Sequence, residues 1–297
     1  MDVLREAVVE LRCFLQAHLL DWLAAGATLG VAYGFFGAGV KPTLRYFTPG
    51  DPSLSYPDRA STVSGTALYL MVFILPPGVC LVTHAAGQWL AKRPRPLSLV
   101  LLDFHHTMLS LVEAYALAAL WKVSLNRGVG RLRPFWLSLV ASNPSSAELS
   151  DGRASYPSGH AAYSHFAGAV ACWWLLSALG VFSSSNVCCR FAKLLLAALP
   201  VGLATFVAAT RIADYKHHGV CCDAALLLPG SRSFFSASDV NAGTFIGIAA
   251  GTAAWHLNYQ FGVGPRRLGE DAATQDKPET GEEGELRRFA APAREGS

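Results

Sequence analysis

Charged residues are scarce in this sequence. Asp, Glu, Lys and Arg together make up 15% of the 297 residues, whereas hydrophobic types make up 52%. The mean hydropathy is +0.32. Soluble globular domains carry about 25% charged residues, so this composition argues against a soluble domain and favours a membrane protein.

Other patterns that would indicate particular functions are also missing. The seven cysteines form no C-x-x-C pair, which argues against a zinc site. No basic tract alternates with aromatic residues, so we expect no nucleic-acid partner. Residues 1–17 contain Arg5, Glu6, Glu10 and Arg12 instead of a short cleavable signal, so we expect a cytoplasmic amphipathic segment before a retained first span.

Long apolar runs dominate the rest of the chain. A helix needs about 20 mainly apolar residues to cross a hydrocarbon core about 30 Å thick. The sequence therefore predicts an all-α polytopic membrane protein with six transmembrane helices, near residues 18–40, 65–90, 99–121, 161–182, 191–210 and 240–258. We expect one membrane domain, residues 18–262, and a disordered cytoplasmic tail, residues 263–297, which is too polar to form a core.

The distribution of Lys and Arg predicts the orientation of these spans. Basic residues near 92–95 and 190–193, and in the tail, place both termini in the cytoplasm by the positive-inside rule. The other connections then face a lumen or the outside of the cell. They are basic as well, which suggests a functional reason for the cations there: Lys122, Arg131, Arg133, Arg211 and Lys216.

Three stretches of these outer connections carry residues suited to phosphate chemistry. They are KVSLNRGVGRLRPFW (122–136), SYPSGH (155–160) and ATRIADYKHH (209–218). Lys122, Arg133 and Arg211 offer positive charge to an anion, and guanidinium groups match phosphate oxygens. His160 and His217 offer proton transfer or nucleophilic attack.

The short run Pro157-Ser158-Gly159-His160 stands at the start of a predicted helix. Unpaired backbone N–H groups at a helix start favour an anion. Ser158 can cap the helix, and Gly159 lets the backbone approach a ligand closely. We therefore expect Ser158 and Gly159 to take part in phosphate binding beside His160.

Together these stretches resemble the signatures of the type 2 phosphatidic acid phosphatases, also called lipid phosphate phosphatases. The family signatures are K-x6-R-P, P-S-G-H and S-R-x5-H-x3-D. The second is complete here, and Arg211-x5-His217 keeps the spacing of the third, with Thr210 in place of Ser. The likeness continues through RYFTPGDPSLSYP (45–57) and DVNAGTFIG (239–247) and covers roughly residues 20 to 258.

This resemblance implies a fold and a set of roles. The fold is the six-helix bundle of the phosphatidic acid phosphatase/haloperoxidase type. His217 is the expected nucleophile and His160 the acid that protonates the leaving alcohol, while an aspartate orients His217. The phosphate cradle is expected from Lys122, Arg133, Ser158, Gly159 and Arg211. The resemblance implies neither a metal nor another cofactor.

The first signature is interrupted. Ten residues, and not six, separate Lys122 from Arg133-Pro134, and the surplus corresponds to NRGV (126–129). In a continuous helix four extra residues add about 6 Å of rise, which places Lys122 one turn away from its expected position. Arg127 or Arg131 is then an alternative source of charge. Gly128 and Gly130 argue against a regular helix at this point.

The third signature is interrupted as well. Position 221, where the family has Asp, is Cys, whereas SDVNAG (238–243) matches the continuation of the family pattern. Residues 219–237 are then an inserted loop, whose closure costs about 2 to 3 kcal/mol. Two aspartates remain candidates for orienting His217; we expect Asp239, with Asp223 as the alternative.

The sequence thus predicts metal-independent dephosphorylation of lipid phosphates at the outer or luminal membrane face, through a phosphohistidine. The expected substrates are phosphatidate, lysophosphatidate, diacylglycerol pyrophosphate or a sphingoid phosphate, supplied by the lipid bilayer. Two alternatives remain open. One is a phosphatase of a soluble ester; the other is a catalytically impaired relative that only binds lipid phosphate or acts as a scaffold, because both signatures are interrupted. The sequence gives no oligomeric state.

Overall fold

The computed structural model of the chain describes residues 9, 12, 16–91, 96–183, 188–218, 238–260 and 264–265. The predicted insert 219–237, including Asp223, and the predicted tail from residue 266 onward lie outside this part of the chain. The predictions made for these two segments therefore stay predictions.

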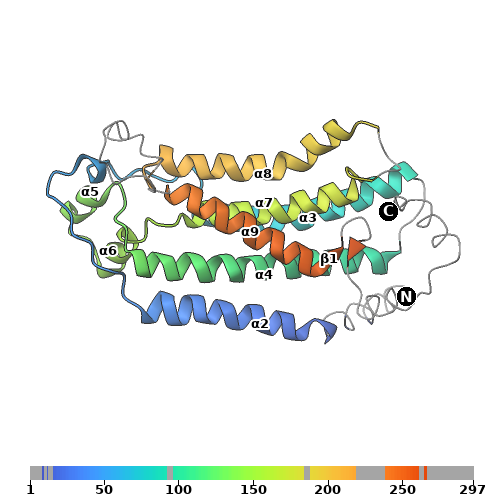
Figure 1. Cartoon of the computed structure of the whole chain (residues 1–297), viewed down its shortest axis with the longest axis horizontal. Coiled ribbons are helices and arrows are strands. Elements are labelled where there is room, and N and C mark those ends of the chain that lie inside the picture. Colours follow the sequence, from blue (N-terminus) through green and yellow to red (C-terminus); the bar gives the residue numbers. More distant parts are fainter. Residues whose placement is uncertain are drawn as a thin grey trace, which may run out of the picture. The chain divides into compact units, whose positions relative to one another are not determined.

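The described residues form a bundle of long helices, shown in Figure 1. The long segments are α2 (Leu19–Leu29), which continues as the π-helix η1 (Gly30–Gly39), α3 (Gly65–Ala91), α4 (Leu97–Val129), α7 (Gly159–Ala178), α8 (Arg190–Ala213) and α9 (Asp239–Asn258). The short elements are the 3-10 helix η2 (Pro52–Leu54), α5 (Trp136–Ala141), α6 (Ser146–Gly152), β1 (Tyr259–Gln260) and β2 (Gly264–Pro265); the two strands pair antiparallel. Each of the six predicted spans coincides with one long helical segment, which confirms the all-α prediction.

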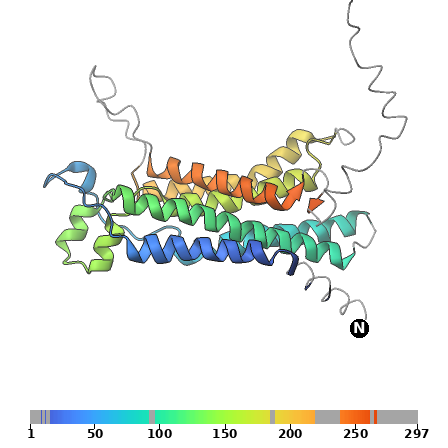
Figure 2. The same ribbon diagram turned by 60° about the horizontal axis from the view of Figure 1, so that its bottom comes forward.

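Helix α7 occupies the centre of the bundle. All its residues from 161 to 171 are buried, and it packs against α3, α4, α8 and α9. Figure 2 shows α9 and α4 running next to each other along the bundle, with the two short helices α5 and α6 gathered at one end. The same end carries the segment between η1 and α3 (Figure 1).

Glycines on α9 set its distance from α7. A Cβ at Gly243, Gly247 or Gly251 would lie 2.4, 2.2 and 2.4 Å from the carbonyl oxygens of Ser158, Ala162 and Phe166, respectively. No side chain fits at such distances. Small residues at four-residue spacing allow membrane helices to approach closely, so α9 brings its first residue, Asp239, directly beside the start of α7.

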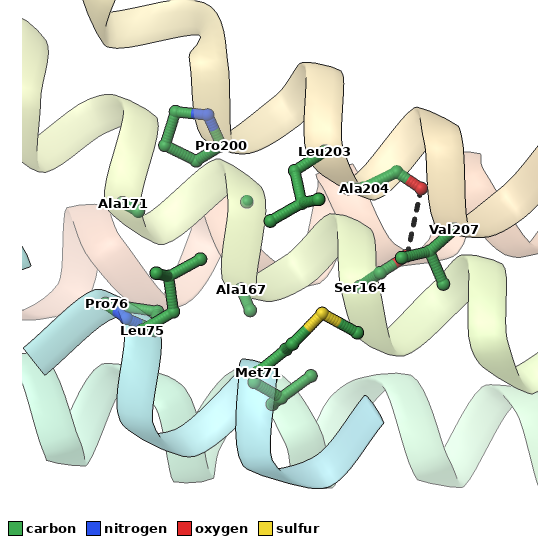
Figure 3. Close-up of a pocket in the computed structure, with 12 residues that line it drawn as sticks. Met71, Leu75, Pro76, Ser164, Ala167, Ala171, Pro200, Leu203, Ala204 and Val207 are labelled. Atoms are coloured by element: carbon green, nitrogen blue, oxygen red, sulfur yellow. Dashed lines mark hydrogen bonds between the residues drawn. The ribbon is translucent and has the colours of Figure 1, made fainter. Parts of the chain in front are cut away.

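Helices α3, α7 and α8 meet in an apolar layer (Figure 3). On α7 the side chains of Ala167 and Ala171 line the space between the three helices, and the Ser164 hydroxyl donates to the carbonyl of Ala204 on α8 at 3.3 Å. The cavity left between the three helices has a volume of about 20 Å³, which is room for about one water molecule. The small side chains on α7 therefore allow α3 and α8 to pack close to it.

Four of the described segments are long and apolar enough to cross a membrane: Leu19–Gly39, Gly65–Trp89, Leu97–Val129 and Arg190–Ala213. The predicted count of six crossings is therefore approximate. Helices α7 and α9 are less apolar because their Gly, Ala, Ser and His residues contact other helices rather than lipid. The outward face of α8 is apolar, with Leu195, Leu199, Leu203 and Phe206 exposed, as expected for a helix surrounded by acyl chains.

The prediction that Gly128 and Gly130 interrupt the helix after Lys122 is wrong. Helix α4 continues to Val129 and ends at Gly130, which has φ +59° and serves as its C-cap. Glycine is the usual residue in this left-handed position. The helix is retained because Asn126 and Arg127 bond to neighbouring segments: the Asn126 amide donates to the carbonyl of Tyr156 at 2.6 Å, and Arg127 donates to the Ser150 hydroxyl at 2.8 Å.

The contact between α7 and α9 predicts how glycine substitutions affect stability. Gly247→Ala should lower the free energy of unfolding by about 1 to 3 kcal/mol, because the new methyl group would force the helices apart. Gly202→Ala on α8 is the matched control, since a Cβ there meets nothing within 4 Å. Thermal unfolding of both variants in detergent measures the effect; equal stability of the two would contradict the proposed packing.

Candidate active site

A polar cavity of about 290 Å³ lies where α4, α7 and α8 meet the connecting segments at the end of the bundle that carries α6. Six of the eight predicted site residues line it: Lys122, Arg133, Gly159, His160, Arg211 and His217. The remaining two, Ser158 and Asp239, are buried behind its wall. These six residues, separated by up to 95 positions in the sequence, are thus brought to one cavity.

Arg211 is held in place by the segment that precedes α3. Its side chain is almost fully buried, and its guanidinium donates to the Asp214 carboxylate at 2.6 Å and to the Ser61 hydroxyl at 3.2 Å. Thr62 donates to the same Asp214 carboxylate, from its backbone N–H at 2.8 Å and from its hydroxyl at 2.7 Å. The connection between η1 and α3 therefore completes one side of the cavity.

Arg133 is fixed in a similar way. Its guanidinium donates to the carboxylate and the carbonyl of Asp151, at 2.9 and 3.0 Å, and to the carbonyl of Lys216 at 2.9 Å. The backbone N–H of Arg133 donates to the carbonyl of Gly152. These contacts orient the guanidinium toward the loop that carries His217, and the charge of Arg133 is only partly balanced by one carboxylate.

Lys122 reaches the cavity despite the four additional residues after it. Its ammonium forms no hydrogen bond within the described residues, and it lies beside Gly159, where a Cβ would come within 3.2 Å of the Lys122 Cε. Glycine at position 159 therefore leaves room for the lysine side chain. The alternatives are engaged elsewhere: Arg127 with Ser150, and Arg131 with Asp239.

His217 is buried and lines the cavity. Its Nδ1–H donates to the carbonyl of Ser155 at 2.7 Å, which leaves Nε2 as the unprotonated nitrogen in a neutral ring. Burial lowers the pKa of His217 to about 4, opposed by the Asp239 carboxylate. The imidazole is therefore neutral at physiological pH, which is the form that acts as a nucleophile.

Asp239 lies next to His217, but the two do not form a short hydrogen bond. The distance from Asp239 Oδ2 to His217 Nδ1 is 3.7 Å. The same oxygen accepts from the Ser155 hydroxyl at 2.5 Å and from the backbone N–H of His218 at 3.0 Å, while Oδ1 accepts from Arg131 at 2.9 Å. The carboxylate thus holds Ser155, whose carbonyl accepts from the His217 ring, and the backbone of His218, and it places a negative charge beside the ring.

His160 faces the same cavity from the first turn of α7. Its Nε2 lies 3.1 Å from the carbonyl of Val63, so this nitrogen carries a proton. A doubly protonated ring would have a second N–H, on Nδ1, to donate to a ligand.

Ser158 has a structural position at the start of α7. Its hydroxyl accepts from the backbone N–H of Ala161 at 3.4 Å and so caps the helix. Its own backbone N–H donates to the carbonyl of Asp239 at 2.9 Å. The structure therefore brings Ser158 close to the site but assigns its hydroxyl to the helix cap, a function that the sequence also predicted.

Five polar residues that support the site were not predicted from the sequence: Ser61, Thr62, Arg131, Ser155 and Asp214. Arg131 was considered only as a substitute for Lys122. Asp214, three residues after Arg211, had a detectable signal, because acidic and basic side chains three positions apart meet on a helix. The other four contact their partners across long sequence separations.

The buried position of His217 predicts a pH-dependent stability. Its pKa is about 4 in the folded protein against 6.5 for an ordinary histidine, so between these values the unfolded state binds more protons. The free energy of unfolding should then fall as the pH decreases from about 6.5 to about 4. His217→Asn should reduce this loss in thermal unfolding at pH values of about 7 and about 5. The comparison variant His256→Asn, at an exposed position, should keep the loss; an undiminished loss in the His217 variant would contradict the assignment.

Comparison with known proteins identifies relatives of this chain. Residues 107–221 match the model of the PAP2 superfamily, a segment that contains Lys122, Arg133, the P-S-G-H turn and His217. A PA-phosphatase related-family protein of Dictyostelium discoideum is 25% identical over 252 residues, which is 83% of this chain and 81% of that protein. No solved structure matches the chain.

Two proteins of Arabidopsis thaliana are also similar. Lipid phosphate phosphatase 1 is 27% identical over 68% of this chain, and lipid phosphate phosphatase 2 is 25% identical over 56%. The matches span 61 and 57% of the length of these two proteins. The chain is therefore similar to the PAP2 superfamily over residues 107–221 and to proteins named lipid phosphate phosphatases over a longer stretch, in line with the resemblance seen in the sequence.

Proposed function

We propose that this protein is a membrane phosphatase that removes the phosphate group from lipid phosphates through a phosphohistidine intermediate. The observation that carries the proposal is the meeting of Lys122, Arg133, Arg211, His160 and His217 around one cavity. The PAP2 match and the names of the related proteins support phosphatase activity on lipid phosphates.

The size of the cavity favours a headgroup as the bound part of the substrate. Its volume of about 290 Å³ lies just below the range of about 300 to 1,000 Å³ for ligand pockets. A phosphate and its neighbouring atoms fit there, while acyl chains remain in the bilayer beside the apolar outer faces of the helices. The proposed substrates are phosphatidate, lysophosphatidate, diacylglycerol pyrophosphate or a sphingoid phosphate.

The first chemical step is attack on phosphorus. Nε2 of neutral His217 forms a bond to the phosphorus atom, and the ester P–O bond breaks. The leaving alcohol oxygen takes a proton from His160, whose doubly protonated form is stabilised by the negative charge of the bound phosphate, and the dephosphorylated lipid forms. Lys122, Arg133 and Arg211 stabilise the negative charge on the equatorial oxygens.

The second step releases phosphate. Now neutral, His160 takes a proton from a water molecule whose oxygen attacks phosphorus, and the P–N bond to His217 breaks. Inorganic phosphate leaves, and both histidines regain their starting states. His217 is therefore the nucleophile in the first step and the leaving group in the second, and His160 changes from acid to base.

We propose that the site faces the lumen or the cell exterior, with both termini in the cytoplasm. The start of α2 and strand β1 lie at the end of the bundle opposite α5 and α6 in Figure 1. The site and the start of α2 are then on opposite membrane faces. The basic residues Arg190 and Lys193 at the start of α8 support a cytoplasmic assignment for the face that carries the start of α2.

The nucleophile assignment predicts the outcome of a phosphate-release assay. Detergent-solubilised protein should release phosphate from phosphatidate in the presence of EDTA, His217→Ala should reduce the rate to background, and vanadate should inhibit competitively because it mimics five-coordinate phosphorus. His256→Ala, at an exposed position, is the matched control. A background rate for the wild type as well would favour a relative that only binds lipid phosphate.

The position of Asp239 predicts a second result. Asp239→Asn should lower kcat by about 100-fold or more, because the loss of the negative charge disturbs both the orientation and the basicity of His217. Asp223→Ala should leave kcat unchanged within about twofold, and thermal unfolding verifies that both variants are folded. The reverse pattern would make Asp223 the orienting residue.

A further inference from the structure

Four tyrosine hydroxyl groups meet between four helical segments next to the cavity. Tyr33 of η1 contacts Tyr115 of α4 at 2.7 Å and Tyr163 of α7 at 2.9 Å, and Tyr69 of α3 contacts Tyr115 at 3.4 Å. We refer to these four residues as the tyrosine cluster. The hydroxyls form a linear chain in the order Tyr69, Tyr115, Tyr33 and Tyr163.

Both ends of this chain belong to the cavity. Tyr69 and Tyr163 line it together with Lys122, His160 and Arg211. Tyr163 is largely buried at 5% exposure, whereas Tyr69 is 41% exposed. The cluster is therefore continuous with the proposed phosphate site, and one of its ends is accessible from outside the bundle.

The number of protons in the cluster leaves one donor for a ligand. Each hydroxyl has one O–H proton and can also accept hydrogen bonds. Four hydroxyls supply four protons, but the three contacts use only three. Within the described residues the remaining proton has no partner. If the three bonds run in one direction, this proton is at Tyr69 or at Tyr163, and both residues line the cavity.

The cluster lies deeper in the bundle than the cations. Tyr163 follows His160 by three residues, Tyr69 follows Gly65 by four, and Tyr115 precedes Lys122 by seven. All three displacements run along the helices away from the end that carries α6. They correspond to about 5 to 10 Å, so a ligand whose phosphate contacts Lys122 would place its next atoms beside the tyrosine hydroxyls.

We propose that the tyrosine cluster is a second sub-site, which binds the hydroxyl or ester carbonyl oxygens adjacent to the phosphate of a glycerolipid. Neutral hydroxyls that donate and accept suit such uncharged oxygens, whereas guanidinium and ammonium groups suit the phosphate. The sub-site selects lipids with oxygen-bearing backbones over simple alkyl phosphates. This inference rests on the proposed function for its substrate class.

A purely structural cluster has different consequences. If the hydroxyls only held the helices together, their removal would lower stability and would affect every substrate equally. A sub-site for backbone oxygens instead affects only the substrates that contain those oxygens, because a buried partner without its hydrogen bond disfavours the bound state.

The test compares two substrates in the full-length protein. Lysophosphatidate has a hydroxyl and an ester carbonyl near its phosphate, and dodecyl phosphate has neither. In Tyr69→Phe and Tyr163→Phe, kcat/KM for lysophosphatidate should fall about 5- to 10-fold, and kcat/KM for dodecyl phosphate should stay within about twofold. Tyr46→Phe, at a fully exposed position, is the matched control and should change neither value.

Two outcomes would overturn the sub-site: an equal loss for both substrates, and unchanged values for both. Failure of the proposed function is a separate result, in which the wild type hydrolyses neither compound. In that case, equilibrium binding to the His217→Ala protein still tests the sub-site, because binding needs no catalysis. It should bind lysophosphatidate several-fold more tightly than dodecyl phosphate, and adding Tyr163→Phe should abolish the difference; equal affinities before that change would refute the sub-site independently of catalysis.

Discussion

The close contact between the start of α7 and the start of α9 is the constraint on which the site depends. The backbone N–H of Ser158 donates to the carbonyl of Asp239, and Gly243 allows the Ser158 carbonyl to lie where any side chain would collide with it. The amide of Asn126 fixes the preceding turn through Tyr156. One backbone hydrogen bond and one buried amide side chain thereby position His160, Asp239 and the end of α4 relative to one another.

Charge explains why the cavity needs so many supporting residues. Arg133, Arg211 and Lys122 repel one another, and burial increases the cost of each charge. Asp151 and Asp214 each bind one guanidinium and hold it in a fixed direction. Lys122 has no such partner among the described residues. An anionic ligand would relieve this excess of positive charge.

Helix composition in the bundle reflects two different environments. Helix α8 exposes large apolar side chains on its outer face, as a lipid-facing helix requires. Helix α7 instead consists largely of small residues, because it is surrounded by protein. Small residues bring α8 and α9 close on either side of it, which is how functional residues at the ends of different helices come within reach of one another.

The sequence by itself determined the all-α fold, the positions of the long helices and six of the residues that line the cavity. Apolar length fixes where a helix can cross lipid, and the P-S-G-H and R-x5-H patterns preserve spacing along single segments. Only the tertiary structure showed that Lys122 still lines the cavity although helix α4 continues through the four additional residues. It also showed that Arg131 pairs with Asp239, and that Ser61 and Thr62 support Arg211. These contacts join segments far apart in the chain, and their partners are selected by helix packing, which leaves no local pattern in the sequence.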